Sequence, residues 1–270
     1  MSRISSTQRD SLVAQFQAIT DSNKDQALSA LKKHNYRLDA AVDAYYQALT
    51  DSPPAQVSTQ KLGALFDKYK DNDPDSTTIG ISGTIQWCED LGIDPEDVSL
   101  LAVACELKSP TVGEWTKSGF IEGWKRLGCE SIEQMKTTIA KLRQKLSDDP
   151  AYFSRVYTYT FNFAKAEGAR SISIENAIAF WTLLLSIGLS GPALPKNGWT
   201  DQHTEWWFEF LKEKGGKGIS KDTWAMLPEF IKVIDDKFEN HDLEAAWPST
   251  IDDFVDWARE KIAEQSQVAT

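Results

Sequence analysis

The chain has 270 residues, of which 41% are hydrophobic and 26% charged, a composition typical of a globular protein with one large domain or two unequal ones. It carries 29 lysine and arginine residues against 40 aspartate and glutamate residues, so its formal net charge is −11. An acidic surface repels phosphate groups, which argues against nucleic acid or an anionic membrane as the main partner and favours a basic protein.

The sequence predicts a protein of a reducing compartment, the cytoplasm or the nucleus, without a membrane anchor. Its longest apolar stretch, residues 180–185, is far shorter than the roughly 18 residues that a membrane span needs. The residues after Met1 lack the apolar core of a signal peptide. The three cysteines, Cys88, Cys105 and Cys129, are odd in number and have no Cys-x-x-Cys spacing, which argues against disulfides and a zinc site.

Residues 1–50 read as a small domain of three helices, and residues 51–59, which include Pro53 and Pro54, read as a linker. Asp21 or Ser22 can cap the second helix, and Asn35 can open the third. Each helix has apolar residues at the spacing of one helical face. The residues expected to point inward are Leu12, Val13, Phe16 and Ile19, then Ala27, Leu28 and Leu31, then Leu38, Ala41, Val42 and Tyr45.

Residues 60–270 also read as helical, so the predicted fold class is all-α. Three short strand-like pieces, residues 79–81, 171–174 and 218–219, each lie between two predicted helices. Pro228 lies inside one predicted helix and indicates a kink or a late helix start. The predicted helices span residues 60–70, 82–91, 95–107, 115–126, 130–147, 149–165, 173–187, 200–213, 221–237 and 249–264.

A helix, a polar loop, a strand-like triplet and a second helix are the layout of an EF-hand. In the loop from Asp71, Asp73 and Asp75 occupy ligand positions, but Ser76 stands where glycine makes the turn and Ser82 where a bidentate glutamate belongs. The loop at residues 165–176 has almost no ligand oxygens. We therefore expect EF-hand-like helix pairs without metal, and a degenerate calcium-binding protein remains an alternative.

Motifs of catalysis are missing from the sequence. It has no phosphate-binding glycine loop, no His-Glu-x-x-His and no Gly-x-Ser-x-Gly. His34, His203 and His241 are interpreted as surface histidines, and Cys88 and Cys105 as core residues. Most of the ten tryptophans are expected to lie in the core, and some of them could line a groove for a partner. No enzyme activity or cofactor is expected, with a tryptophan-lined enzyme cleft kept as a rival hypothesis.

The segment from Lys221 to Glu260 has eleven acidic and four basic residues, a net charge of −7. One interpretation is a helix with aspartates well placed at its N-terminus. The other is an acidic docking surface, in which the small Ala246 permits close approach and Asp222 and Asp252 bind lysine or arginine. The residues alone leave both interpretations open.

Several distinctive sequence blocks occur in order over nearly the whole chain. They are Tyr69-Lys70-Asp71, Ile79-Gly80-Ile81, Trp87-Cys88-Glu89-Asp90-Leu91, Leu127-Gly128-Cys129-Glu130-Ser131-Ile132-Glu133, Phe161-Asn162-Phe163-Ala164-Lys165, Ile219-Ser220-Lys221-Asp222-Thr223-Trp224, Ala246-Trp247-Pro248 and Asp252-Asp253-Phe254-Val255. Together these blocks resemble the defective-in-cullin-neddylation proteins, scaffold-type ligase components that promote transfer of a ubiquitin-like modifier onto cullins. The resemblance implies a metal-free domain of EF-hand-like pairs. It also implies a cullin-binding patch of Asp222, Ala246 and Asp252.

The resemblance further implies an apolar pocket for the acetylated N-terminal methionine of the neddylation conjugating enzyme. Residues 1–50 resemble a ubiquitin-associated domain, but Ala18-Ile19-Thr20 stands near the place of the Met-Gly-Phe/Tyr loop that commonly meets ubiquitin. The positions that match the pocket are Ile81, Thr84, Leu100, Val103, Ala104, Val112, Trp115, Phe163 and Leu183.

The function that the resemblance implies is that of a non-catalytic co-ligase. Such a protein binds the winged-helix C-terminal domain of a cullin, works beside the RING subunit and holds the tail of the conjugating enzyme. Ubiquitin is a further partner through the N-terminal domain. The alternative functions are those of a degenerate EF-hand calcium-binding protein and of a ubiquitin-binding adaptor.

Overall fold

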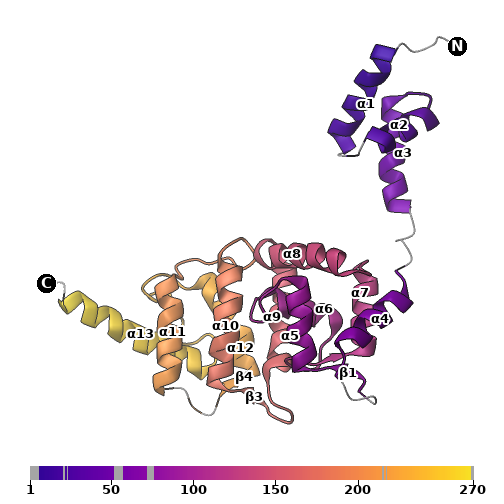
Figure 1. Ribbon diagram of the computed structural model, residues 1–270. Coiled ribbons are helices and arrows are strands. Elements are labelled where there is room, and N and C mark those ends of the chain that lie inside the picture. The colour runs from indigo at the N-terminus through magenta and orange to yellow at the C-terminus, as the bar shows by residue number, and fades with distance from the viewer. Residues whose placement is uncertain are drawn as a thin grey trace. The chain divides into compact units, whose positions relative to one another are not determined.

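The computed structural model describes residues 6–20, 22, 24–51, 57–71, 76–214, 216 and 218–268. The chain forms two compact units, residues 1–57 and 58–270. Within the described residues there are thirteen helices and four strands of two residues each (Figure 1). The fold is therefore all-α, as predicted.

The N-terminal unit consists of α1 (Ser6–Thr20), α2 (Lys24–Lys33) and α3 (Leu38–Asp51). Its buried core is Val13, Phe16, Ala27, Leu31 and Ala41, all of which the apolar spacing placed inward. Leu12, Leu28, Leu38, Val42 and Tyr45 pack against that core and are partly buried.

Three expectations for the N-terminal unit and for the predicted linker after it need correction. Ile19 is 50% exposed, because the buried face of α1 is centred on Val13 and Phe16, and Ile19 lies at its margin. Asn35 does not open α3: it has a φ of 52° in the turn after α2, and α3 begins at Leu38. The range 51–59 is helical at both ends, since α3 includes Asp51 and the next helix begins at Thr59. Residue 21 and residues 52–56 lie outside the described residues.

Ten helices occur in the described part of the second unit (Figure 1), and the bounds of each overlap one of the ten predicted segments. Helix α8 contacts α5, α6, α9 and α10, which joins the earlier and later halves of the unit. The helices are α4 (Thr59–Tyr69), α5 (Ile81–Leu91), α6 (Ser99–Leu107), α7 (Lys117–Arg126), α8 (Ile132–Asp148), α9 (Pro150–Ala164), α10 (Ile174–Leu189), α11 (Asp201–Lys214), α12 (Lys221–Val233) and α13 (Ser249–Val268).

Two short antiparallel ribbons tie helix pairs together. Strand β1 (Thr78–Ile79) pairs with β2 (Trp115–Thr116), and β3 (Ser171–Ile172) pairs with β4 (Ile219–Ser220). A helix follows β2 and β4 at once and follows β1 and β3 after one residue, which is the EF-hand-like arrangement predicted. Residues 115–116 were expected to be helical, but they form β2, because a two-residue strand is specified by its partner across the ribbon and not by its own spacing.

The loop that resembled a calcium site uses its first aspartate within the fold. The Asp71 carboxylate accepts a hydrogen bond from the Gly80 backbone N–H at 3.2 Å. A Cβ at Gly80 would lie 2.7 Å from Asp71 Oδ2, so the two residues fit closely. Asp73 and Asp75 lie outside the described residues, and no group of three potential metal ligands occurs among the residues that are described.

Pro228 lies inside α12 without delaying its start at Lys221. A proline lacks the N–H that would bond to the carbonyl four residues earlier, here that of Trp224. This carbonyl accepts a hydrogen bond from the Tyr157 hydroxyl instead, at 2.7 Å. The proline is thus accommodated by a side chain of α9.

Candidate functional site

The three residues of the predicted acidic patch lie on or beside α12 and α13. Asp222 is exposed in the first turn of α12, and Ala246 is exposed in the loop that precedes α13. Asp252 lies in the first turn of α13, and its side chain is 30% exposed. Helices α12 and α13 contact each other, and Gly218, Ile219, Thr250 and Asp253 line one cavity of about 530 Å³ beside them.

Helix ends contribute to the electrostatics of this patch. The N-terminus of a helix carries partial positive charge, and Asp222 and Asp252 each lie in the first turn of a helix, where an acidic residue is favourable for the helix. Asp253 and Asp256 of α13 are also exposed, which extends the negative surface beyond Asp252. The arrangement suits a partner that presents lysine or arginine.

Asp252 forms a hydrogen bond with His241, a residue that was predicted to lie at the surface. His241 Nε2 lies 2.9 Å from Asp252 Oδ1, and the His241 side chain is only 1% exposed. His203 is buried as well, and burial lowers the pKa of its imidazole. Both surface assignments were wrong, because these side chains are covered by contacts between residues distant in sequence.

A second candidate site is an apolar cavity of about 650 Å³ between α5, α6, the loop before β2, and α10. Ile81 and Val112 lie at its rim, where they are 70% and 57% exposed. The predicted pocket residues that line it are Ile81, Thr84, Leu100, Val112, Trp115, Phe163 and Leu183.

Val103 and Ala104 do not line the cavity, contrary to expectation. Both are buried in α6, which is covered along nearly its whole length, so helical spacing could not show which face met the cavity. The cavity is also lined by four residues that were not predicted, Ile85, Leu101, Ala179 and Phe180. Ile85 and Leu101 follow Thr84 and Leu100 in the sequence, and Ala179 and Phe180 lie about one helical turn before Leu183. This proximity to predicted pocket residues was the signal that could have found them.

Thr84 and Trp115 are joined inside the cavity wall. The Trp115 indole N–H donates to Thr84 Oγ1 at 2.8 Å, and the Thr84 hydroxyl donates to the Gly80 carbonyl at 2.8 Å. The polar atoms of both side chains are therefore satisfied within the protein. The cavity surface that they help to form can remain apolar.

The rim that carries Val112 is held in place by a buried serine. Ser109 is 4% exposed, and its hydroxyl lies 2.9 Å from the Thr111 carbonyl. The Tyr159 hydroxyl of α9 donates to the Ser109 carbonyl. These bonds fix the loop between α6 and β2, so the rim is built into the fold.

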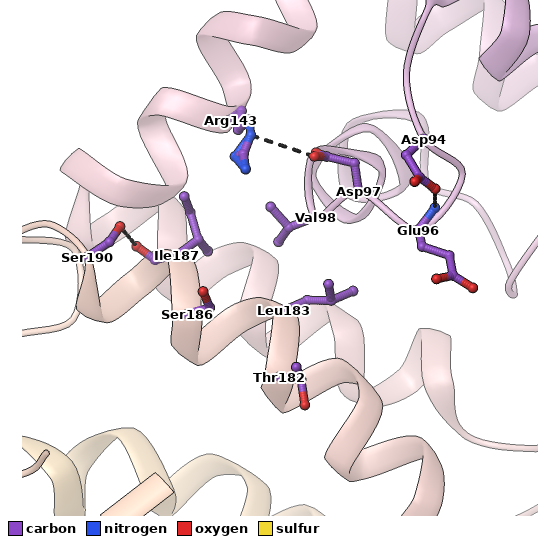
Figure 2. Close-up of a pocket in the computed structure, with 10 residues that line it drawn as sticks. All are labelled: Asp94, Glu96, Asp97, Val98, Arg143, Thr182, Leu183, Ser186, Ile187 and Ser190. Carbon is purple, nitrogen blue, oxygen red and sulfur yellow. Dashed lines mark hydrogen bonds and ion pairs between the residues drawn. The ribbon is translucent and has the colours of Figure 1, made fainter. Parts of the chain in front are cut away.

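The apolar cavity continues into a more polar hollow of about 580 Å³, shown in Figure 2. Both hollows are lined by Glu96, Asp97, Thr182 and Leu183. In Figure 2, Arg143 of α8 faces Asp97, with 3.7 Å between Arg143 Nε and Asp97 Oδ2. The combined groove suits a chain segment with an apolar end and a polar continuation.

The cysteines lack the environment of a nucleophile. Desolvation raises the pKa of the Cys88 thiol to about 11 and that of the Cys105 thiol to about 11. A reactive thiolate requires a pKa shifted in the opposite direction.

Among the helices in the described part of the chain, none has the length and apolar character needed to cross a membrane.

Comparison with known proteins relates both units to described families. Residues 134–257 match the family model for cullin binding, and residues 10–52 match that for the UBA-like domain. The chain is 34% identical to "Defective in cullin neddylation protein 1" of Mycosarcoma maydis, over 96% of this chain and 97% of that protein. It is 38% identical to the protein of the same name from Cryptococcus neoformans, over 95% and 96%. It is also 30% identical to human "DCN1-like protein 4", over 87% and 74%.

Proposed function

This chain belongs to the defective-in-cullin-neddylation family. We propose that it is a non-catalytic co-ligase, which brings a cullin together with the conjugating enzyme that carries the modifier as a thioester. Its N-terminal unit is a UBA-like domain, and its second unit contains the cullin-binding region. The observation that carries the proposal is the occurrence, in this one unit, of an acidic patch and a separate apolar cavity. A scaffold for two partners needs two such surfaces.

The acidic patch of Asp222, Ala246 and Asp252 is the proposed docking surface for the winged-helix C-terminal domain of the cullin. Its members are two carboxylates in the first turns of helices and one exposed residue without a bulky side chain, and such carboxylates bind lysine or arginine. Charge complementarity of this kind raises the association rate and selects the partner.

The apolar cavity is the proposed site for the acetylated N-terminal methionine of the conjugating enzyme. Acetylation removes the positive charge of the amino terminus, and an uncharged group enters an apolar cavity at a much lower desolvation cost. The walls formed by Leu100, Phe163 and Leu183 suit the methionine side chain. The polar hollow beside the cavity offers a path for the rest of the tail.

The proposed mechanism is tethering. The thioester is carried by the conjugating enzyme, and the attacking amine is a lysine of the cullin, so no side chain of this protein reacts. Holding both partners, beside the RING subunit, raises their effective concentration and restricts their orientation. The cytoplasm and the nucleus are the proposed locations, because these reducing compartments suit free cysteines.

Ubiquitin is a second proposed partner, through the UBA-like domain. Ile19 of α1 is 50% exposed beside the position of the absent Met-Gly-Phe/Tyr loop, and it offers an apolar contact there. A titration of labelled ubiquitin with wild type and Ile19→Asp tests this partner. Equal binding by both proteins, or none by wild type, would contradict it.

The co-ligase proposal is tested by single-turnover transfer of the modifier from the preformed thioester of the conjugating enzyme to a cullin bound to its RING subunit. We expect this protein to accelerate transfer. The acceleration should disappear when the conjugating enzyme has an unacetylated amino terminus. Equal rates with and without this protein would contradict the proposal.

A further inference from the structure

His241 is a buried histidine of the second unit that contacts the acidic patch at Asp252. Its side chain is 1% exposed and lies within reach of Phe230 and Trp247, with ring centroids 5.9 Å and 6.4 Å away. Nε2 lies 2.9 Å from Asp252 Oδ1. Nδ1 is buried and has no hydrogen-bond partner among the described residues.

These contacts determine which nitrogen of the neutral ring carries the hydrogen. With the hydrogen on Nε2, the ring donates to the Asp252 carboxylate and leaves only an acceptor lone pair buried at Nδ1. With the hydrogen on Nδ1, a donor would be buried without an acceptor, and two acceptor atoms would face each other at 2.9 Å. The structure therefore favours the Nε2–H tautomer.

The loop that carries His241 is well anchored. The Asp235 carboxylate accepts backbone hydrogen bonds from Lys237, Glu239 and Asn240 at 2.7–2.9 Å. Arg259 of α13 donates to the Phe238 carbonyl at 2.6 Å. The histidine is thus held against α13 by its own loop, independently of its bond to Asp252.

We propose that His241 is a positioning residue for cullin docking: its Nε2–H fixes Asp252 Oδ1, so that Oδ2 is presented to a basic side chain of the cullin. This inference rests on the proposed docking role of Asp252. The torsion of an aspartate carboxylate is otherwise broad, so a free side chain would lose more rotational freedom on binding. No described residue donates a hydrogen bond to Oδ2, and the Asp252 side chain remains 30% exposed.

The test is a double-mutant cycle in the full-length protein, with affinity for the isolated cullin C-terminal domain measured by calorimetry. His241→Phe keeps an aromatic ring among Phe230 and Trp247 but removes the donor, and it should weaken binding roughly tenfold. His241→Gln places an amide N–H near the position of Nε2 and should restore most of the affinity. In an Asp252→Ala background, His241→Phe should cause no further loss.

Each outcome separates the inference from the proposed function. No cullin binding by wild type would overturn the docking role of the patch, and the role of His241 with it. Binding that is weaker in Asp252→Ala than in wild type but unchanged in His241→Phe would overturn only the inference. An equal loss from His241→Phe with and without Asp252 would show general disturbance of the loop and also overturn it. If His241→Phe does not fold, His241→Asn replaces it, because the shorter side chain cannot reach Oδ1.

A spectroscopic measurement supplies an independent readout of the geometry. Nitrogen-15 spectra of the three imidazoles, assigned by comparison with the His241→Phe variant, should show His241 as the Nε2–H tautomer. The Nδ1–H tautomer at His241 would contradict the proposed hydrogen bond, whatever the binding result.

Discussion

Tyr157 of α9 and Trp224 of α12 are joined by two hydrogen bonds that run in opposite directions. The Tyr157 hydroxyl donates to the Trp224 carbonyl at 2.7 Å, and the Trp224 indole N–H donates to the Tyr157 carbonyl at 3.0 Å. Their rings are stacked with centroids 4.9 Å apart. The first bond fills the place of the N–H that Pro228 lacks, so it connects the helix that carries Asp222 to the core.

Removing the Tyr157 hydroxyl should destabilise the second unit. In Tyr157→Phe, the buried Trp224 carbonyl loses its donor, and the Trp181 indole N–H loses the acceptor that lies 2.8 Å from it. We expect the free energy of unfolding in urea to fall by about 1–3 kcal/mol per unsatisfied group. All ten tryptophans lie in this unit, so their fluorescence reports its unfolding.

A second substitution provides the matched control for that measurement. Pro228→Ala restores an N–H that can reach the Trp224 carbonyl from within α12. The cost of Tyr157→Phe should therefore be smaller in the Pro228→Ala background. Equal costs in both backgrounds would show that the hydroxyl does not replace the missing helical donor.

Thr84→Val tests the polar pair inside the apolar cavity. Valine has nearly the same shape as threonine but leaves the Trp115 indole N–H without its acceptor. We expect a loss of about 1–3 kcal/mol in stability and weaker binding of an acetylated peptide with the sequence of the conjugating-enzyme tail. Thr137→Val is the control, because that exposed hydroxyl bonds to the Glu133 carbonyl of its own helix and lies outside the cavity. Equal effects of the two substitutions would contradict the account of the wall.

Leu183→Asp separates the two proposed binding surfaces. A carboxylate in the apolar cavity must be desolvated by any apolar ligand, so binding of the acetylated tail should fall by roughly tenfold or more. Leu183 does not belong to the acidic patch, so cullin affinity should stay as in wild type. The two affinities are measured side by side by fluorescence anisotropy. Loss of both would indicate misfolding, and loss of neither would remove the cavity from the proposed function.

Asp235 gives the second unit a defined dependence on acid. Partial burial alone would raise the pKa of its carboxyl. Hydrogen bonds from the backbone of residues 237–240 lower this pKa by more, so the pKa in the folded protein is below its ordinary value. A group with a lowered pKa in the folded state stabilises the fold above its unfolded pKa, and this contribution is lost as the pH falls through the folded value.

Between about pH 5 and pH 3, wild type should therefore lose more stability than Asp235→Asn, in which this titration is absent. The measurement is the urea midpoint at each pH, followed by tryptophan fluorescence. Parallel losses in the two proteins would show that Asp235 does not contribute to the acid response of the loop.

Helix positions were predictable from the sequence because apolar spacing follows the buried face of each helix. The same spacing failed for α6, where Leu100 reaches the cavity while Val103 and Ala104 face other parts of the core, since a helix buried on all sides has no polar face for reference. The bond between His241 and Asp252 was not predictable, because it joins a loop to a helix and leaves no periodic pattern.

The patch of Asp222, Ala246 and Asp252 is proposed to bind a cullin, and calorimetric titration with the isolated cullin C-terminal domain measures that binding itself. Wild type should bind with micromolar or tighter affinity. The Asp222→Lys/Asp252→Lys variant should lose about 2–5 kcal/mol of binding free energy, because like charges then face each other.

The matched control, Glu122→Lys/Glu167→Lys, changes the net charge equally at two exposed positions outside the patch and should bind as wild type does. Loss of binding in the patch variant alone, with its fold intact, is the result that the account predicts. Equal affinity of the patch variant and wild type would contradict it.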